Sequence, residues 1–187
     1  MINEERSSLS IDKAEFAFWA VGDINSNTKR GMLAEYIVGK ALGCLTEHQD
    51  AWHSSDLLYR GFAIEVKSSG FGTPPFWPTK LPPVPKFDIA ERKWAWSNTT
   101  GAFVGDGTPK RHADHYVFAY TLAKEIGEFA PFHTDGWRFV VCSEQDIARS
   151  YGAQKSVSLT SLCIDHQTLA VGELKSAVDQ KIRETLQ

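Results

Sequence analysis

Cysteine is scarce in this chain of 187 residues, and the sequence has no long apolar run. Cys44, Cys142 and Cys163 are odd in number and widely spaced, with no CxxC pair, which disfavours a disulfide framework or a zinc site. No apolar stretch approaches the roughly 20 residues that cross a membrane. The first residues also lack the basic-then-apolar order of a signal peptide. We therefore expect a cytoplasmic protein with reduced thiols and no membrane association.

An excess of basic residues is missing as well. The chain has 20 Lys plus Arg against 23 Asp plus Glu, a net charge of −3. Proteins that coat nucleic acid without specificity are usually basic, so that role is disfavoured, although a local basic cleft remains compatible with this charge. The hydrophobic content of 42% and the mixed charges indicate a globular fold, with residues 1–187 forming a single domain.

Hydrophobic periodicity predicts helices and strands in alternation. The helix over 10–21 is expected to bury Ile11, Ala14, Phe18 and Val21, and a second helix starts with a cap at Asn27 or Thr28 and ends before Gly43. The predicted helices are 10–21, 28–42, a short one capped by Ser143, and 173–186; the strands are 56–59, 62–68, 115–122 and 136–142. This order predicts an α/β fold with a central mixed sheet of about four to five strands flanked by helices.

A proline-rich insertion interrupts this pattern at about 70–86. Its six prolines exclude a regular helix or a central strand. Phe71, Phe76 and Trp77 favour burial, so an ordered loop is expected there.

The hairpin over 56–68 carries charges that an apolar hairpin does not need. If Arg60-Gly61 is a two-residue loop, Asp56 stands opposite Glu65 with the Cβ atoms about 5 Å apart. The two carboxylates would then repel each other by roughly 3 kcal/mol at an effective dielectric constant near 20. A hard dication such as Mg²⁺ offsets this repulsion because it binds oxygen ligands. A three-residue loop would shift the register and separate the acids.

Two further side chains fit such a centre. Lys67 shares the face of Glu65, where an ammonium group can orient or deprotonate a metal-bound water or stabilise charge on a phosphate. Glu35 lies on a helix flank with Met32, Val38, Gly39 and Leu42, where a carboxylate is costly unless it is paired or metal-bound. The alternative is a solvated hairpin face on which Lys67 pairs with Glu65 and Glu35 is a boundary residue.

Asp56, Glu65-Val66-Lys67 and Glu35 together resemble the signature of the PD-(D/E)XK nuclease superfamily, particularly its solitary bacterial members. The resemblance implies a restriction-endonuclease-like core and hydrolysis of DNA phosphodiester bonds in restriction, defence or repair. It implies Mg²⁺, with Mn²⁺ as a substitute, held by Asp56, Glu65 and the Val66 carbonyl. Lys67 would then assist the attacking water, and Glu35 would be a further ligand or act through a water. Ser55 replaces the proline of the signature.

Nucleic-acid contacts are predicted outside this centre. Lys29 and Arg30 lie at the start of the second helix, whose free N–H groups favour phosphate. Cations and tryptophans alternate after the insertion, a combination that suits nucleic acid. The predicted contacts are Lys29, Arg30, Ser68, Lys93, Lys110 and Arg111.

The expected partner is DNA, and a homodimer is possible because double-strand cutters of this kind commonly pair two copies. One alternative function is a catalytically silent nuclease-like domain that binds nucleic acid or a protein partner. Another is an unrelated α/β enzyme or interaction protein in which the motif is accidental.

Overall fold

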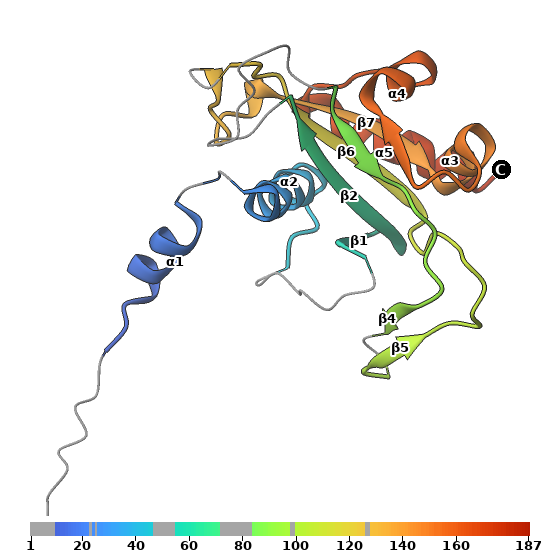
Figure 1. Ribbon diagram of the computed structural model, residues 1–187, viewed down its shortest axis with the longest axis horizontal. Helices are drawn as coiled ribbons and strands as arrows, with labels where there is room; N and C mark the ends of the chain where they lie inside the picture. The colour runs from blue at the N-terminus through green and yellow to red at the C-terminus, as the bar shows by residue number, and fades with distance from the viewer. Residues whose placement is uncertain are drawn as a thin grey trace, which may run out of the picture.

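The computed structural model places a mixed α/β domain around one four-stranded sheet, with two small two-stranded sheets beside it (Figure 1). The structure describes residues 10–22, 24, 26–46, 55–71, 84–97, 100–125 and 128–187. The predicted α/β class and the number of strands in the central sheet are thereby confirmed. Most of the predicted proline-rich insertion, residues 72–83, lies outside the described residues.

The central sheet has the strand order β1-β2-β6-β7. β2 and β6 run parallel, whereas β1 with β2 and β6 with β7 are antiparallel pairs. β1 is a short edge strand, and among the described residues no strand pairs with the outer side of β2 beyond Ile64. The strands are β1 (Leu57–Tyr59), β2 (Phe62–Gly70), β6 (His115–Thr121) and β7 (Trp137–Ser143).

Each face of this sheet packs against its own hydrophobic cluster. α2 (Asn27–Leu42) and α5 (Val171–Thr185) cover one face, where Ile64 and Val66 of β2 are buried. The other face packs on residues of α3, α4, β3 and β8, and there β2 presents its odd-numbered side chains. These elements are α3 (Glu144–Tyr151), α4 (Leu159–Asp165), β3 (Lys86–Asp88) and β8 (Ser156–Ser158).

Helix α1 (Lys13–Val21) confirms the predicted first helix but not its burial. No residue of α1 is buried, and Ile11 and Phe18 are 67% and 78% exposed. Figure 1 shows the helix projecting away from the sheet. The prediction of an inward apolar face was wrong because periodicity shows that a face exists without showing what covers it. No helix in the described ranges is long and apolar enough to span a bilayer.

Helix α2 begins and ends close to the predicted positions. Its N-cap is Ser26, whose hydroxyl accepts the Lys29 N–H, and not the predicted Asn27 or Thr28. Gly43 terminates the helix with φ 73°, a left-handed conformation that glycine adopts without strain. The cap confirms the predicted end of the helix.

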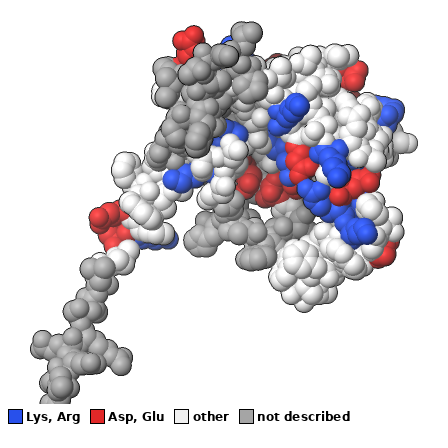
Figure 2. All heavy atoms as spheres, in the orientation of Figure 1, with Lys and Arg blue, Asp and Glu red and all other residues white. Residues whose placement is uncertain are grey.

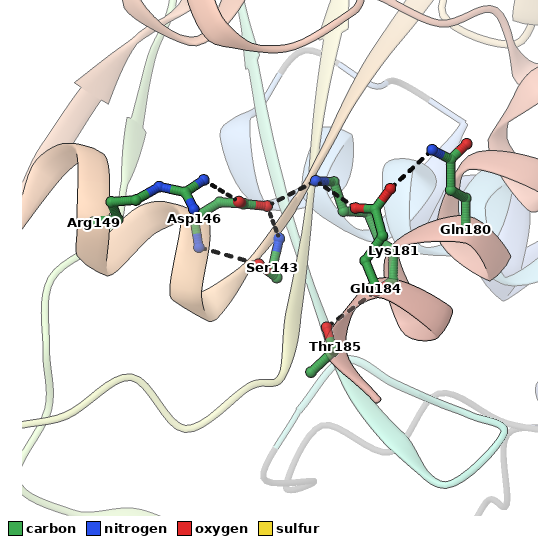
Figure 3. A network of polar contacts seen from close by, with 7 residues as sticks. All are labelled: Ser143, Asp146, Arg149, Gln180, Lys181, Glu184 and Thr185. Carbon is green, nitrogen blue, oxygen red and sulfur yellow. Dashed lines mark hydrogen bonds and ion pairs between the residues drawn. The ribbon is translucent and has the colours of Figure 1, made fainter. Parts of the chain in front are cut away.

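A polar network ties α3 to α5 (Figure 3). Ser143 and Asp146 form a capping box at the start of α3. Asp146 also pairs with Lys181 of α5 at 3.0 Å and with Arg149 at 2.7 Å. Burial alone raises the pKa of Asp146, but the Ser143 N–H and Lys181 outweigh it and lower that pKa to about 2.

Asp146→Asn is expected to lower the free energy of unfolding by about 2 kcal/mol at pH 7. Because the pKa is lower in the folded state, this contribution is present above pH 4 and disappears as the pH falls from about 4 to 2. Urea denaturation across this range measures it, with Asp135→Asn on the exposed surface as the control. A loss that does not depend on pH would contradict the charge-based account.

Candidate active site

The turn between β1 and β2 sets the position of every acidic side chain in the hairpin. Arg60 and Gly61 have φ values of 53° and 84°, as both central residues of a two-residue type I′ turn require. A non-glycine residue is strained at such an angle. Arg60 is held there by Asp179 of α5, 3.4 Å from its Nε, and by the Tyr59 ring, 5.4 Å from its guanidinium carbon.

The two-residue turn confirms the predicted register. One further step along the antiparallel pair places Asp56 opposite Glu65. That position does not exchange backbone hydrogen bonds, which is where facing side chains approach most closely. The observed pairs are Tyr59 with Phe62, Leu58 with Ala63, and Leu57 with Ile64.

The Asp56 side chain extends the hydrogen bonding between the two hairpin strands. Its Oδ2 accepts the backbone N–H of Val66 at 2.6 Å, beyond the last residue of β2 that pairs with β1. In a strand the N–H and the C=O of one residue point to the same edge, so the Val66 carbonyl is directed to the Asp56 side. This is the carbonyl that the resemblance implies as a metal ligand.

Repulsion and burial act together on Asp56. Burial raises its pKa first, and the charges of Glu65 and Glu35 raise it further. The Val66 N–H and Lys67 oppose them, and the resulting pKa is about 7. The residue as a whole keeps contact with water, which screens part of both effects. The site therefore carries more negative charge than it compensates, the condition under which a dication binds.

Lys67 forms an ion pair with Glu65 on the same face of β2. The two side chains are 30% and 22% exposed, so the pair opens toward solvent. Burial acts to lower the pKa of Lys67, but Glu65, Asp56 and Asp88 raise it above its ordinary value. A lysine that stays protonated donates hydrogen bonds, so the structure favours charge stabilisation and water orientation over proton abstraction.

Glu35 reaches the same region from α2. It lines an apolar cavity of about 420 Å³ together with Asp56, Met32, Tyr36 and Leu58, among other residues. Its charge raises the pKa of Asp56, which places the two carboxylates within electrostatic reach of each other. The arrangement agrees with the prediction that the helix brings Glu35 toward the hairpin acids.

A magnesium site at these acids stays a prediction. Among the described residues, no group of three or more His, Cys, Asp or Glu side chains is arranged to hold a metal. Mg²⁺ needs fewer protein ligands, because it commonly binds one or two carboxylates and takes its remaining ligands from waters and substrate phosphates. Asp56, Glu65 and the Val66 carbonyl are oxygen donors of this kind. Glu65 would share its charge between Lys67 and the cation.

Two predicted nucleic-acid contacts are buried. The Arg111 side chain is only 1% exposed, and its Nε donates to the Ile89 carbonyl at 2.8 Å. It also lies 3.7 Å from Glu91 and from Glu144. Arg111 therefore joins these segments, and the nucleic-acid contact proposed for it stays a prediction.

Arg30 is 5% exposed and donates to the Asn27 side chain at 3.0 Å. The side chain is therefore poorly accessible in this conformation, and its predicted contact with nucleic acid stays a prediction. The other predicted contacts are more accessible: Lys29 and Ser68 are half-buried, and Lys93 and Lys110 are exposed.

A second cavity, of about 200 Å³, opens on the Glu65 and Lys67 face. Three of its lining residues were not predicted from the sequence: Asp88 of β3, Tyr116 of β6 and Phe103 of β5 (Ala102–Val104). Burial raises the pKa of Tyr116, and the nearby charge of Glu65 adds to this. The sequence held no local signal for these residues, since each joins this cavity only through long-range packing.

No protein-family model matches this chain, and a search of curated proteins found no match. The resemblance to PD-(D/E)XK nucleases therefore stays a prediction drawn from the residues.

Proposed function

We propose that this protein is a divalent-metal-dependent endonuclease that hydrolyses DNA phosphodiester bonds, with a restriction-endonuclease-like arrangement of its core. One observation carries the proposal: the hairpin register sets Asp56 opposite Glu65, with Lys67 on the same face. Restriction, defence or repair is the proposed setting, and Mg²⁺ or Mn²⁺ the proposed cofactor.

In this proposal each residue has a distinct task. Asp56, Glu65 and the Val66 carbonyl would hold a divalent cation at the edge of β2, where the ion would supply Lewis-acid catalysis for phosphodiester hydrolysis. The protonated Lys67 donates toward the attacking water or the phosphate oxygen and stabilises negative charge that grows in the transition state. Glu35 contributes further negative charge from α2, directly or through a water.

A second candidate is a nuclease-like domain that binds nucleic acid or protein without cutting. The ion pair between Lys67 and Glu65 favours it, because the charge of Glu65 is then partly compensated without a cation. In that case Lys67 would compensate the charge of Glu65, and Asp56 would be left without an equivalent ion pair.

A cleavage assay separates the two candidates. Plasmid, single-stranded DNA and RNA are incubated with the protein in Mg²⁺, in Mn²⁺ and in EDTA. The proposal predicts DNA cleavage that EDTA abolishes. Cleavage that continues in EDTA would contradict metal-dependent hydrolysis, and binding without cleavage of any substrate would support the second candidate.

A further inference from the structure

The cavity beside Lys67 has two unlike walls. One wall is the sheet itself, with Glu65 and Lys67, and the other includes Trp96 and Phe103 of the hairpin formed by β4 (Ala95–Ser97) and β5 (Ala102–Val104). In the part of the chain that the structure describes, β4 and β5 form a sheet with each other alone, and neither strand contributes a residue to the two core clusters.

The hairpin turns aromatic surface outward. Trp94, which precedes β4, is 53% exposed and Phe103 is 63% exposed. Trp96 meets Phe103 edge-on, with ring centroids 5.4 Å apart and planes at 81°. No described residue of the hairpin is charged, and Figure 2 shows this region as a lobe of neither colour beside a patch where both signs mix. Exposed aromatic faces grouped on a cavity wall indicate a ligand.

Cations line the same cavity beside the acids Glu65 and Asp88, and Arg92 pairs with Asp88 at 2.6 Å. Arg92 and Lys110 both line it, and they are joined by a pair of backbone hydrogen bonds of 2.8 and 3.2 Å. His112 fixes this rim through a 3.0 Å contact between its Nε2 and the Arg92 carbonyl. Flat aromatic surface beside positive charge matches a nucleic-acid strand, in which the base stacks and the phosphate pairs.

We propose that this cavity binds one unpaired nucleobase, stacked on Trp94 and Phe103, while the adjoining phosphate lies at Lys67. The substrate class is then nucleic acid with an unpaired nucleotide next to the cleaved bond, such as a single strand, a flap or a frayed end. This inference rests on the proposed function for the placement of the phosphate. At about 200 Å³ the cavity is smaller than the roughly 300–1,000 Å³ of typical sites for drug-sized ligands, which suits a single base. Bases within a duplex are stacked on their neighbours, so they do not present a free face.

Fluorescence anisotropy in EDTA tests the inference without any cleavage. The probes are a labelled 20-nucleotide single strand and the blunt duplex of the same sequence. The wild type is expected to bind the single strand more tightly. Trp94→Ala and Phe103→Leu are each expected to weaken single-strand binding by about tenfold and duplex binding by less than about twofold. Phe103→Leu keeps an apolar side chain and removes only the flat ring.

Phe18→Ala is the matched control, since Phe18 is an exposed phenylalanine on α1. It should leave both affinities unchanged. Equal losses of affinity for the two probes would overturn the inference. Unchanged single-strand affinity in both Trp94→Ala and Phe103→Leu would overturn it as well. Selective loss in a protein that cuts nothing would uphold base binding and overturn the nuclease proposal. If the protein cleaves DNA and neither Trp94→Ala nor Phe103→Leu changes single-strand binding, the nuclease proposal is upheld and base binding at this cavity is overturned.

Discussion

Replacing Lys67 with methionine is expected to lower the rate of DNA cleavage by about 10²–10⁴-fold. Lys67 lies beside Glu65 and remains protonated, so it is placed to donate to the attacking water or to a phosphate oxygen. Methionine keeps much of the apolar stem and removes the charge. Single-turnover cleavage at saturating Mg²⁺ measures the effect, because it isolates the chemical step from product release.

Lys155→Met is the control, since Lys155 is an exposed lysine outside both cavities. It should cleave at the wild-type rate. Circular dichroism and thermal denaturation should show that the Lys67 variant is folded. Wild-type cleavage by a folded Lys67→Met protein would remove Lys67 from the reaction.

Asp56→Asn is expected to abolish measurable cleavage and, in EDTA, to raise the stability of the folded protein at pH 8. The pKa of Asp56 is raised from 3.8 to about 7 in the native state, so the native protein binds this proton more tightly than the unfolded chain does. The resulting contribution to stability is fully present below pH 4 and is lost as the pH rises to about 7. Above that pH the ionised carboxylate opposes folding, and asparagine removes it.

Urea denaturation in EDTA at pH 8, 6 and 4 measures this second effect. The advantage of Asp56→Asn should be largest at pH 8 and should shrink toward pH 4. Asp165→Asn, on the exposed surface of α4, should show no such trend. An Asp56→Asn protein that is less stable than the wild type at pH 8 would show that repulsion among the acids is not significant.

The hairpin was predictable because its information is local. The alternation of side chains and the Arg60-Gly61 turn together determine which residues face each other, and the structure has that register. The cap at Gly43 is local in the same sense. These features placed Asp56, Glu65 and Lys67 on one face before any tertiary contact was known.

Features that depend on tertiary packing were not predictable. Nothing in the sequence around Arg111 distinguishes it from a surface cation. Its side chain is nevertheless buried, because the Ile89 carbonyl and two glutamates from distant segments contact it. The tryptophans near the cavity were noted from the sequence, but the exposure of Phe103 was not predictable, because it depends on the tertiary position of the β4–β5 hairpin. Local propensity contains no information about such distant neighbours.

Titration of the protein with Mn²⁺, followed by electron paramagnetic resonance of the free ion, tests most directly whether the opposed carboxylates hold a cation. The account predicts one Mn²⁺ per chain at pH 8, weaker binding by roughly tenfold at pH 6 because Asp56 is then protonated, and a similar or greater loss in Asp56→Asn. Equal Mn²⁺ affinity in the wild type and in an Asp56→Asn, Glu65→Gln double variant would contradict it.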